Sequence, residues 1–146
     1  MSEAELSSLE ANISVKIPPI YRTLLSLVGH NPNAIADWVG SDWNARDLLN
    51  LEMHNQRATR DLLYRNGALE HFPDDAFVFL LHQGYSFLYV EAHKGDDSPV
   101  FNGEETDEPF RPPRLIYQSL HDYMQLWAAQ IWQDARNLNS LERNGV

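Results

Sequence analysis

Four residues of this sequence could assemble into a metal site if the fold brought them together. They are His71, Asp74, His82 and His93, and neutral imidazoles and carboxylates are good ligands for zinc or non-haem iron. None of the six histidines has the paired helical spacing of a zinc protease, and such residues also occur by chance in turns and at strand ends. A small metal-dependent hydrolase built on this His/Asp cluster stays open as an alternative, and no metal ligand is assigned.

Most other catalytic motifs are absent from the sequence, and nothing in it points to a pair of carboxylates for glycoside hydrolysis, a pair that no sequence alone excludes. The chain has no cysteine, which excludes disulfide scaffolds, thiolate zinc sites, iron–sulfur clusters and a cysteine nucleophile. The seven glycines are scattered singly, so no loop can cradle a phosphate through consecutive backbone N–H groups. Neither a dinucleotide fingerprint nor a nucleophile elbow is present. We therefore expect a protein that is not an enzyme, has no catalytic residues and uses no cofactor.

Acidic residues gather in one part of the chain. The formal net charge is −10, and residues 70–108 hold ten acids against one base, Lys94. Such a field repels the phosphates of nucleic acids and favours a basic protein partner. Solubility alone would also account for the acids, so composition leaves both explanations open.

We expect the partner-binding surface in the last part of this acidic stretch. Six carboxylates lie on adjoining loops around a short predicted strand and should crowd one edge of the sheet: Asp96, Asp97, Glu104, Glu105, Asp107 and Glu108. The last four lack the ligand spacing and central glycine of an EF-hand, so a solvated acidic loop is favoured over a calcium loop. Trp43 joins the set because tryptophan is over-represented in binding hot spots, with burial in the core as the alternative.

Two helices are predicted near the N-terminus, over residues 2–12 and 17–28. The first begins at Ser2, whose spacing from Glu5 is that of a capping box. The second has Pro18 and Pro19 at its start, where a missing N–H costs nothing. Gly29 is placed to end it as a left-handed cap.

Two longer helices are predicted further along the chain. The third is expected over residues 42–66, although its apolar pattern weakens over 53–59 and leaves room for a break there. The last begins at Ser119, and its apolar stripe at helical spacing should lay Trp127 against the sheet. That stripe consists of Leu120, Tyr123, Met124, Trp127, Ile131, Ala135 and Leu138.

Between these helices the apolar pattern becomes that of β-strands. Residues 76–81 and 86–91 form two apolar runs on either side of Gly84, which predicts a hairpin. Unbroken apolar runs indicate strands that are either buried on both faces or covered by helices on one face and hydrophobic on the other. We therefore expect Phe79, Leu81, Phe87 and Tyr89 on one buried face or the other. A short third strand is predicted over residues 99–102, followed by an acidic, proline-bearing loop over 103–113.

These elements predict one domain of the α+β class over residues 1–146. It should contain a mixed, mostly antiparallel sheet whose central hairpin (about 76–81 and 86–91) is flanked by N-terminal helices and a long C-terminal helix. The first residues lack the features of a secretory signal, and no apolar run approaches the ~18 residues of a membrane span. We therefore expect a cytoplasmic protein with no membrane contact, while nothing in the sequence sets its oligomeric state.

Four segments of the chain together resemble the SUKH superfamily, also called the Smi/Knr family. They are IPPIYRTLLSLVG (17–29), DDAFVFLLHQGYSFLYVEA (74–92), GDDSPVF (95–101) and IYQSLHDYMQLW (116–127). The segment 38–69 fits the family pattern poorly, because it is longer and more helical than the pattern. The resemblance implies one SUKH-like domain with an α+β fold and no catalytic motif.

The resemblance also implies a class of function. Members of the superfamily include bacterial immunity proteins that neutralise toxins, many of them nucleases, and fungal regulators of cell-wall synthesis. An inhibitor of a nuclease gains from an acidic surface, because the active site of the toxin must be basic to hold phosphate. The expected function is therefore non-catalytic protein binding, as an immunity protein against a basic toxin, with a housekeeping adaptor as a further alternative.

Overall fold

The computed structural model describes residues 1–30, 48–105 and 111–143. Three predicted binding residues, Trp43, Asp107 and Glu108, lie outside this part of the chain. The elements follow the order α1 (Glu3–Ile13), α2 (Pro19–Val28), α3 (Leu48–Arg65), the 3-10 helix η2 (Leu69–His71), β1 (Ala76–His82), β2 (Ser86–Glu91), the 3-10 helix η3 (Ala92–Asp97), β3 (Val100–Glu104), β4 (Arg114–Tyr117) and α4 (Leu120–Arg143).

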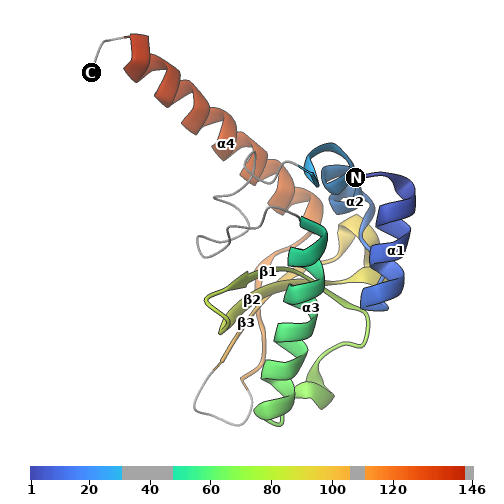
Figure 1. Ribbon diagram of the computed structural model, residues 1–146. Helices are drawn as coiled ribbons and strands as arrows, with labels where there is room; N and C mark the ends of the chain where they lie inside the picture. The colour runs from blue at the N-terminus through green and yellow to red at the C-terminus, as the bar shows by residue number, and fades with distance from the viewer. Residues whose placement is uncertain (31–47, 106–110, 144–146) are drawn as a thin grey trace.

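The strands form one four-stranded sheet in the order β1-β2-β3-β4, and all three pairings are antiparallel (Figure 1). This confirms the predicted α+β class, with N-terminal helices and a long C-terminal helix around the hairpin of β1 and β2. The third strand is two residues longer at its end than predicted. The fourth strand was missed, because residues 114–117 stood between a predicted loop and a predicted helix.

The helices bury both faces of the sheet. On one face α1, α2 and the start of α4 enclose the larger core, whose fully buried members include Tyr21, Phe77 and Phe79. On the other face α3 and the segment around Phe72 cover a second cluster. That cluster consists of Leu62, Phe72, Ala76, Val78, Leu81, Phe87 and Tyr89. The unbroken apolar runs of the hairpin are therefore explained by burial on both sides.

A β-bulge divides the four alternating residues of the hairpin between these two clusters. The register of β1 against β2 shifts between Val78 and Leu80, and an extra residue in one strand reverses the faces that follow it. Phe79 therefore faces the larger core, whereas Leu81 faces the second cluster with Phe87 and Tyr89. All four side chains are buried, as predicted.

The first two helices are capped in different ways. In α1 the Ser2 hydroxyl accepts from the Glu5 N–H at 3.4 Å, and the Glu5 carboxylate accepts from the Ser2 N–H at 2.7 Å, so the predicted capping box is present. In α2 the N-cap residue is Pro18, which offers no side-chain hydrogen bond. The predicted left-handed cap at Gly29 is wrong, because the φ angle of Gly29 is −59°. Position 29 has no room for a larger residue, because the Met1 side chain occupies the space that a Cβ atom would take.

The third helix is continuous over residues 53–59, so the weaker apolar pattern there does not mark a break. The apolar pattern weakens there because the helix buries polar side chains, Asn55, Gln56 and Thr59. The Gln56 amide donates to the Val78 carbonyl at 2.8 Å and bonds α3 directly to β1. Residues 42–47 of the predicted helix lie outside the described residues.

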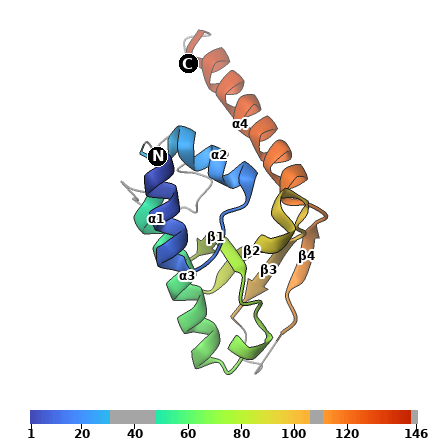
Figure 2. The same cartoon turned by 90° about the vertical axis from the view of Figure 1, so that its right-hand side faces the viewer.

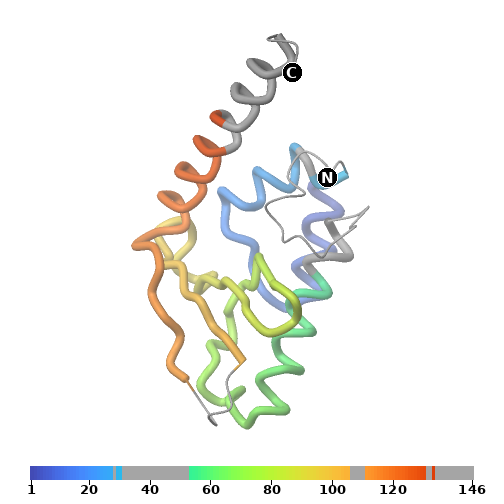
Figure 3. The backbone as a smooth tube through the Cα atoms, turned by 90° about the vertical axis from the view of Figure 1, so that its left-hand side faces the viewer, coloured from blue at the N-terminus to red at the C-terminus, as the bar shows by residue number. Residues whose placement is uncertain are grey.

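The last helix begins as predicted, with the Ser119 hydroxyl accepting from the Asp122 N–H at 3.0 Å. Leu120 and Met124 are buried in the larger core, and Trp127 is partly buried against it. Figures 2 and 3 show η3 at the base of α4 and close to the start of α2. The Leu120 N–H donates to the Ser98 carbonyl at 2.8 Å, so the end of η3 positions the start of α4. Among the described residues, no helix has the length and apolar character that crossing a membrane requires.

Candidate protein-binding surface

The predicted acidic residues that the structure describes form two groups at opposite ends of β3. Asp96 and Asp97 end η3 before the strand, whereas Glu104 and Glu105 stand at its end. The strand runs from Val100 to Glu104, which spans about 13 Å at ~3.3 Å per residue. These four carboxylates therefore do not crowd one edge of the sheet, contrary to the expectation from their loop positions.

Asp96 has a structural contact that the sequence did not suggest. Its carboxylate oxygen Oδ1 accepts from the Ile20 N–H in the first turn of α2 at 2.8 Å. Pro18 cannot cap this turn, so Asp96 supplies the missing acceptor from η3, which lies 76 residues away in sequence but next to the start of α2. A carboxylate also suits the positive end of a helix. Asp97, next to it, is exposed and has no hydrogen bond or ion pair within the described ranges.

At the other end of β3 the two glutamates lie at the surface. The Glu104 carboxylate accepts from the Asn102 amide at 2.9 Å, and its second oxygen lies 3.9 Å from the guanidinium of Arg111. Glu105 continues the strand pairing, because its N–H donates to the Tyr85 carbonyl at 2.6 Å. The Asn66 amide lies 3.4 Å from the Glu105 carboxylate. Both side chains stay exposed and available to a partner.

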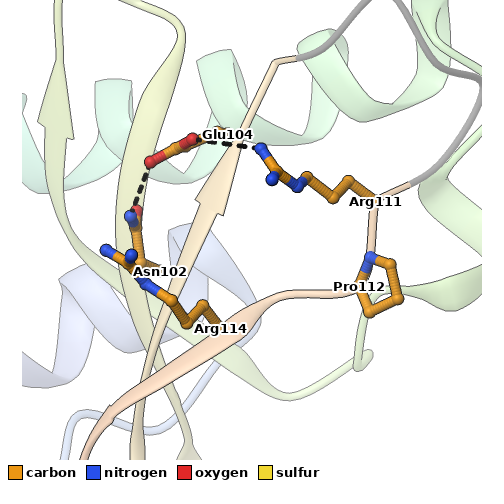
Figure 4. Close-up of a pocket in the computed structure, with 5 residues that line it drawn as sticks. All are labelled: Asn102, Glu104, Arg111, Pro112 and Arg114. Atoms are coloured by element: carbon orange, nitrogen blue, oxygen red, sulfur yellow. Dashed lines mark hydrogen bonds and ion pairs between the residues drawn. The ribbon is translucent and has the colours of Figure 1, made fainter.

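A shallow hollow of about 100 Å³ opens beside Glu104 on one face of β3 and β4. Figure 4 shows Glu104 between Asn102 and Arg111, with Arg114 beside Asn102. Asn102 and Arg114 are register partners across the two strands, so sheet pairing fixes their proximity. We call this site the β3–β4 hollow, and its lining residues are Asn102, Glu104, Arg111, Pro112 and Arg114.

Sequence reasoning missed the two arginines of the β3–β4 hollow. The acidic stretch was counted only as far as Glu108, and Arg111 and Arg114 follow directly after it. The signal that would have found them is the sequence Arg-Pro-Pro-Arg at residues 111–114, in which two prolines stiffen the link between two exposed cations. The surface at this end of β3 is therefore mixed in charge and not uniformly acidic.

The four residues of the alternative metal site do not form a cluster. His93 is bound to Asp75, whose oxygen Oδ2 lies 2.6 Å from the ring Nδ1 and accepts from the His93 N–H at 2.9 Å. His71 lies 3.4 Å from Glu70, and the ring of His82 lies 6.0 Å from that of Tyr85. In residues 1–30, 48–105 and 111–143 no three His, Asp or Glu side chains are placed to hold a metal ion.

Local contacts shift the pKa of several groups in this region. Burial raises the pKa of Asp75, but the hydrogen bonds from His93 outweigh it and leave that pKa below its ordinary value. Burial, with a smaller contribution from the charge of Glu91, raises the pKa of the Tyr89 phenol to about 12. Both groups thus hold one charge state near neutral pH, which suits structural roles better than proton transfer.

Comparison with known proteins places the chain in a family. No curated protein and no solved structure matches it. The SMI1 / KNR4 family (SUKH-1) matches residues 1–126, which include the whole sheet and the segment 38–69 where the resemblance was weakest. The chain therefore belongs to the SMI1 / KNR4 family (SUKH-1), as its hairpin and flanking motifs predicted.

Proposed function

We propose that this protein is a non-catalytic binding module for a basic partner protein, and that it acts as an immunity protein that neutralises a toxin of the nuclease type. The observation that carries the proposal is the family match over residues 1–126, because SUKH proteins are protein-interaction modules. We place this activity in the cytoplasm, where such a toxin would act.

Electrostatics support a basic partner over a nucleic acid. The chain carries a formal net charge of −10, and Asp97, Glu104 and Glu105 stand exposed at the two ends of β3. Carboxylates on a protein surface repel phosphates, whereas they steer a basic protein toward the surface and raise its association rate. A nuclease domain presents such a basic surface because it must hold phosphate.

The alternatives differ in what they would require of the molecule. A metal-dependent hydrolase would need His71, Asp74, His82 and His93 to converge. The three histidines have different neighbours: Glu70, Tyr85 and Asp75, respectively. A housekeeping adaptor of cell-wall regulation would use the same binding surface with a different partner. The identity of the partner therefore separates the leading proposal from the adaptor.

The proposal is tested with the partner protein itself. The tagged chain is used to capture its partner from the cells that encode it, and the partner is then expressed alone and together with the chain. We expect a basic partner that is toxic alone and harmless in the presence of the chain. An acidic partner, or a toxicity that the chain leaves unchanged at saturating expression, would contradict the proposal.

A further inference from the structure

The β3–β4 hollow differs in charge from the rest of the chain. Its described lining has two guanidinium groups, Arg111 and Arg114, and one carboxylate, Glu104, whereas the chain as a whole has a net charge of −10. Arg114 is exposed and makes no hydrogen bond or ion pair in the part of the chain that the structure describes. Among the described residues that line the hollow, the cations therefore outnumber the carboxylates by one.

The contact between Glu104 and Arg111 is loose enough to be exchanged. The two charged groups are 3.9 Å apart, and their side chains are 44% and 63% exposed, respectively. Exposed ion pairs of this kind contribute little to stability, because water and salt screen them. The second oxygen of Glu104 is held by the Asn102 amide at 2.9 Å, so Glu104 can remain on Asn102 when Arg111 turns to another anion.

The size and donor set of the hollow fit a carboxylate. Its volume of about 100 Å³ is ample for a group as small as a carboxylate, because a single water molecule needs only about 10–15 Å³ of such space. Guanidinium groups match carboxylates through paired N–H donors. Glu104 already places a carboxylate between an amide and a guanidinium in this hollow (Figure 4).

We propose that the β3–β4 hollow receives one carboxylate of the partner protein, held by Arg114 and Arg111. The carboxylate comes from an aspartate or glutamate side chain or from the C-terminus of the partner. The assignment rests on the proposed function for the origin of the carboxylate, while the binding chemistry belongs to this chain alone. A partner that is basic elsewhere must then carry one acid opposite the hollow, and a basic protein without that acid leaves Arg114 unpaired and binds less well.

The binding chemistry is tested on the isolated protein by following the ¹H–¹⁵N signals of Gly103, Asn102 and Arg114 during titration at constant ionic strength. The probes are acetate, inorganic phosphate, a tripeptide with both ends capped and a central glutamate, and an N-acetylated tripeptide with uncharged side chains and a free C-terminal carboxylate. We expect saturable shifts with acetate and with at least one peptide, and the tighter peptide identifies the source of the carboxylate. The variant Arg114→Gln should lose the saturable shift, and the control Arg57→Gln, which removes an exposed arginine of α3, should keep it.

A second variant distinguishes specific binding in the β3–β4 hollow from nonspecific attraction of anions to an exposed arginine. Glu104→Gln removes the internal competitor, and one unit charge at about 4 Å in water corresponds to a roughly fivefold gain in affinity for acetate. Linear, unsaturable shifts, the same affinity in Arg114→Gln, or binding of phosphate alone would overturn the assignment. Because no partner protein is used, failure here leaves the proposed function intact, and failure to find a basic partner leaves this result intact.

Discussion

The two ends of β3 carry the same kind of residue and use it differently. At the start of the strand the Asp96 carboxylate accepts from the Ile20 N–H at 2.8 Å and completes the first turn of α2. At its end the Glu104 side chain is 44% exposed and lines the β3–β4 hollow. One acidic stretch of sequence therefore supplies a folding contact at one end of the strand and exposed carboxylates at the other, where we propose that a partner binds.

This difference shows what a run of charge can and cannot indicate. The count of acids showed where carboxylates gather in the sequence, but it could not separate Asp96, which accepts a hydrogen bond from the Ile20 N–H, from the exposed Asp97. The separation depends on an N–H group 76 residues away in sequence. Substitutions at the two ends should therefore have opposite profiles, with stability affected at the first end and partner binding at the second.

The largest effect is expected where β3 rests on the hairpin. Phe87 is 2% exposed, and its ring covers Gly103, the neighbour of Glu104. Phe87→Ala should cost about 3–5 kcal/mol, a large part of a total stability of ~5–15 kcal/mol, and should leave the protein poorly folded. The measurement is urea unfolding, with Tyr64→Ala as the control because Tyr64 is 73% exposed. An unfolding midpoint equal to that of the wild type would show that the Glu104 end is not built on this contact.

A smaller effect is expected at the glycine beneath that ring. A Cβ at position 103 would overlap the Phe87 ring, and overpacking of this kind costs about 1–3 kcal/mol. Gly103→Ala should therefore be destabilised, and combining it with Phe87→Leu should recover part of the loss because the smaller side chain leaves space. Additive losses in the double variant would rule out a direct clash as the cause.

The start of the strand is tested by removing the cap of α2. Asp96→Ala should cost about 0.5–2 kcal/mol, the usual range for a lost N-cap, and the Ile20 amide should exchange its hydrogen faster. The matched variant Asp97→Ala removes an exposed neighbour and should stay within about 0.5 kcal/mol of the wild type. Equal free energies of unfolding for the two variants would contradict the claim that Asp96, and not Asp97, caps α2.

How much of this could be predicted depends on how local each signal is. The capping box of α1 joins residues three apart, and the hairpin turns at Gly84, whose φ is +76°, so both were readable from the chain. The four residues of β4, the bulge after Val78 and the cap from Asp96 depend on partners distant in sequence. Arg114 lies in the hollow only because β4 pairs with β3. Because the sequence did not predict β4, it could not place Arg114 there.

The carboxylate of Glu5, in the capping box of α1, should make the stability of the protein depend on pH. Hydrogen bonds from the Ser2 backbone and hydroxyl lower the pKa of Glu5 from 4.5 to about 2. A folded-state pKa below the ordinary value means that the stabilisation is complete above about pH 4.5 and is lost as the pH falls toward 2. When the pH is lowered from 4.5 to about 2, the melting temperature of the Glu5→Gln variant should therefore fall less than that of the wild type. Parallel curves would show that the capping box contributes nothing that depends on charge.

The smallest effect on stability is expected at the Glu104 end. Glu104→Gln with Glu105→Gln should leave the melting temperature nearly unchanged, because both carboxylates are exposed and such surface substitutions usually stay within about 0.5 kcal/mol. The control is Asp61→Asn with Asp122→Asn, which removes two exposed acids from α3 and α4. Marked destabilisation of the first pair alone would make both ends of β3 structural.

The central claim, that the exposed acids at the end of β3 attract a basic partner, is tested most directly by association rates. Stopped-flow mixing of the captured partner with the wild type, the Glu104→Gln/Glu105→Gln variant and the control pair is repeated across a range of salt concentrations. Charge steering acts mainly on association and fades with salt, over a Debye length of about 8 Å at physiological ionic strength. We predict that the glutamine variant associates severalfold more slowly at low salt, and that all three proteins converge at high salt. Equal rates for the wild type and the glutamine variant at every salt concentration would contradict the account.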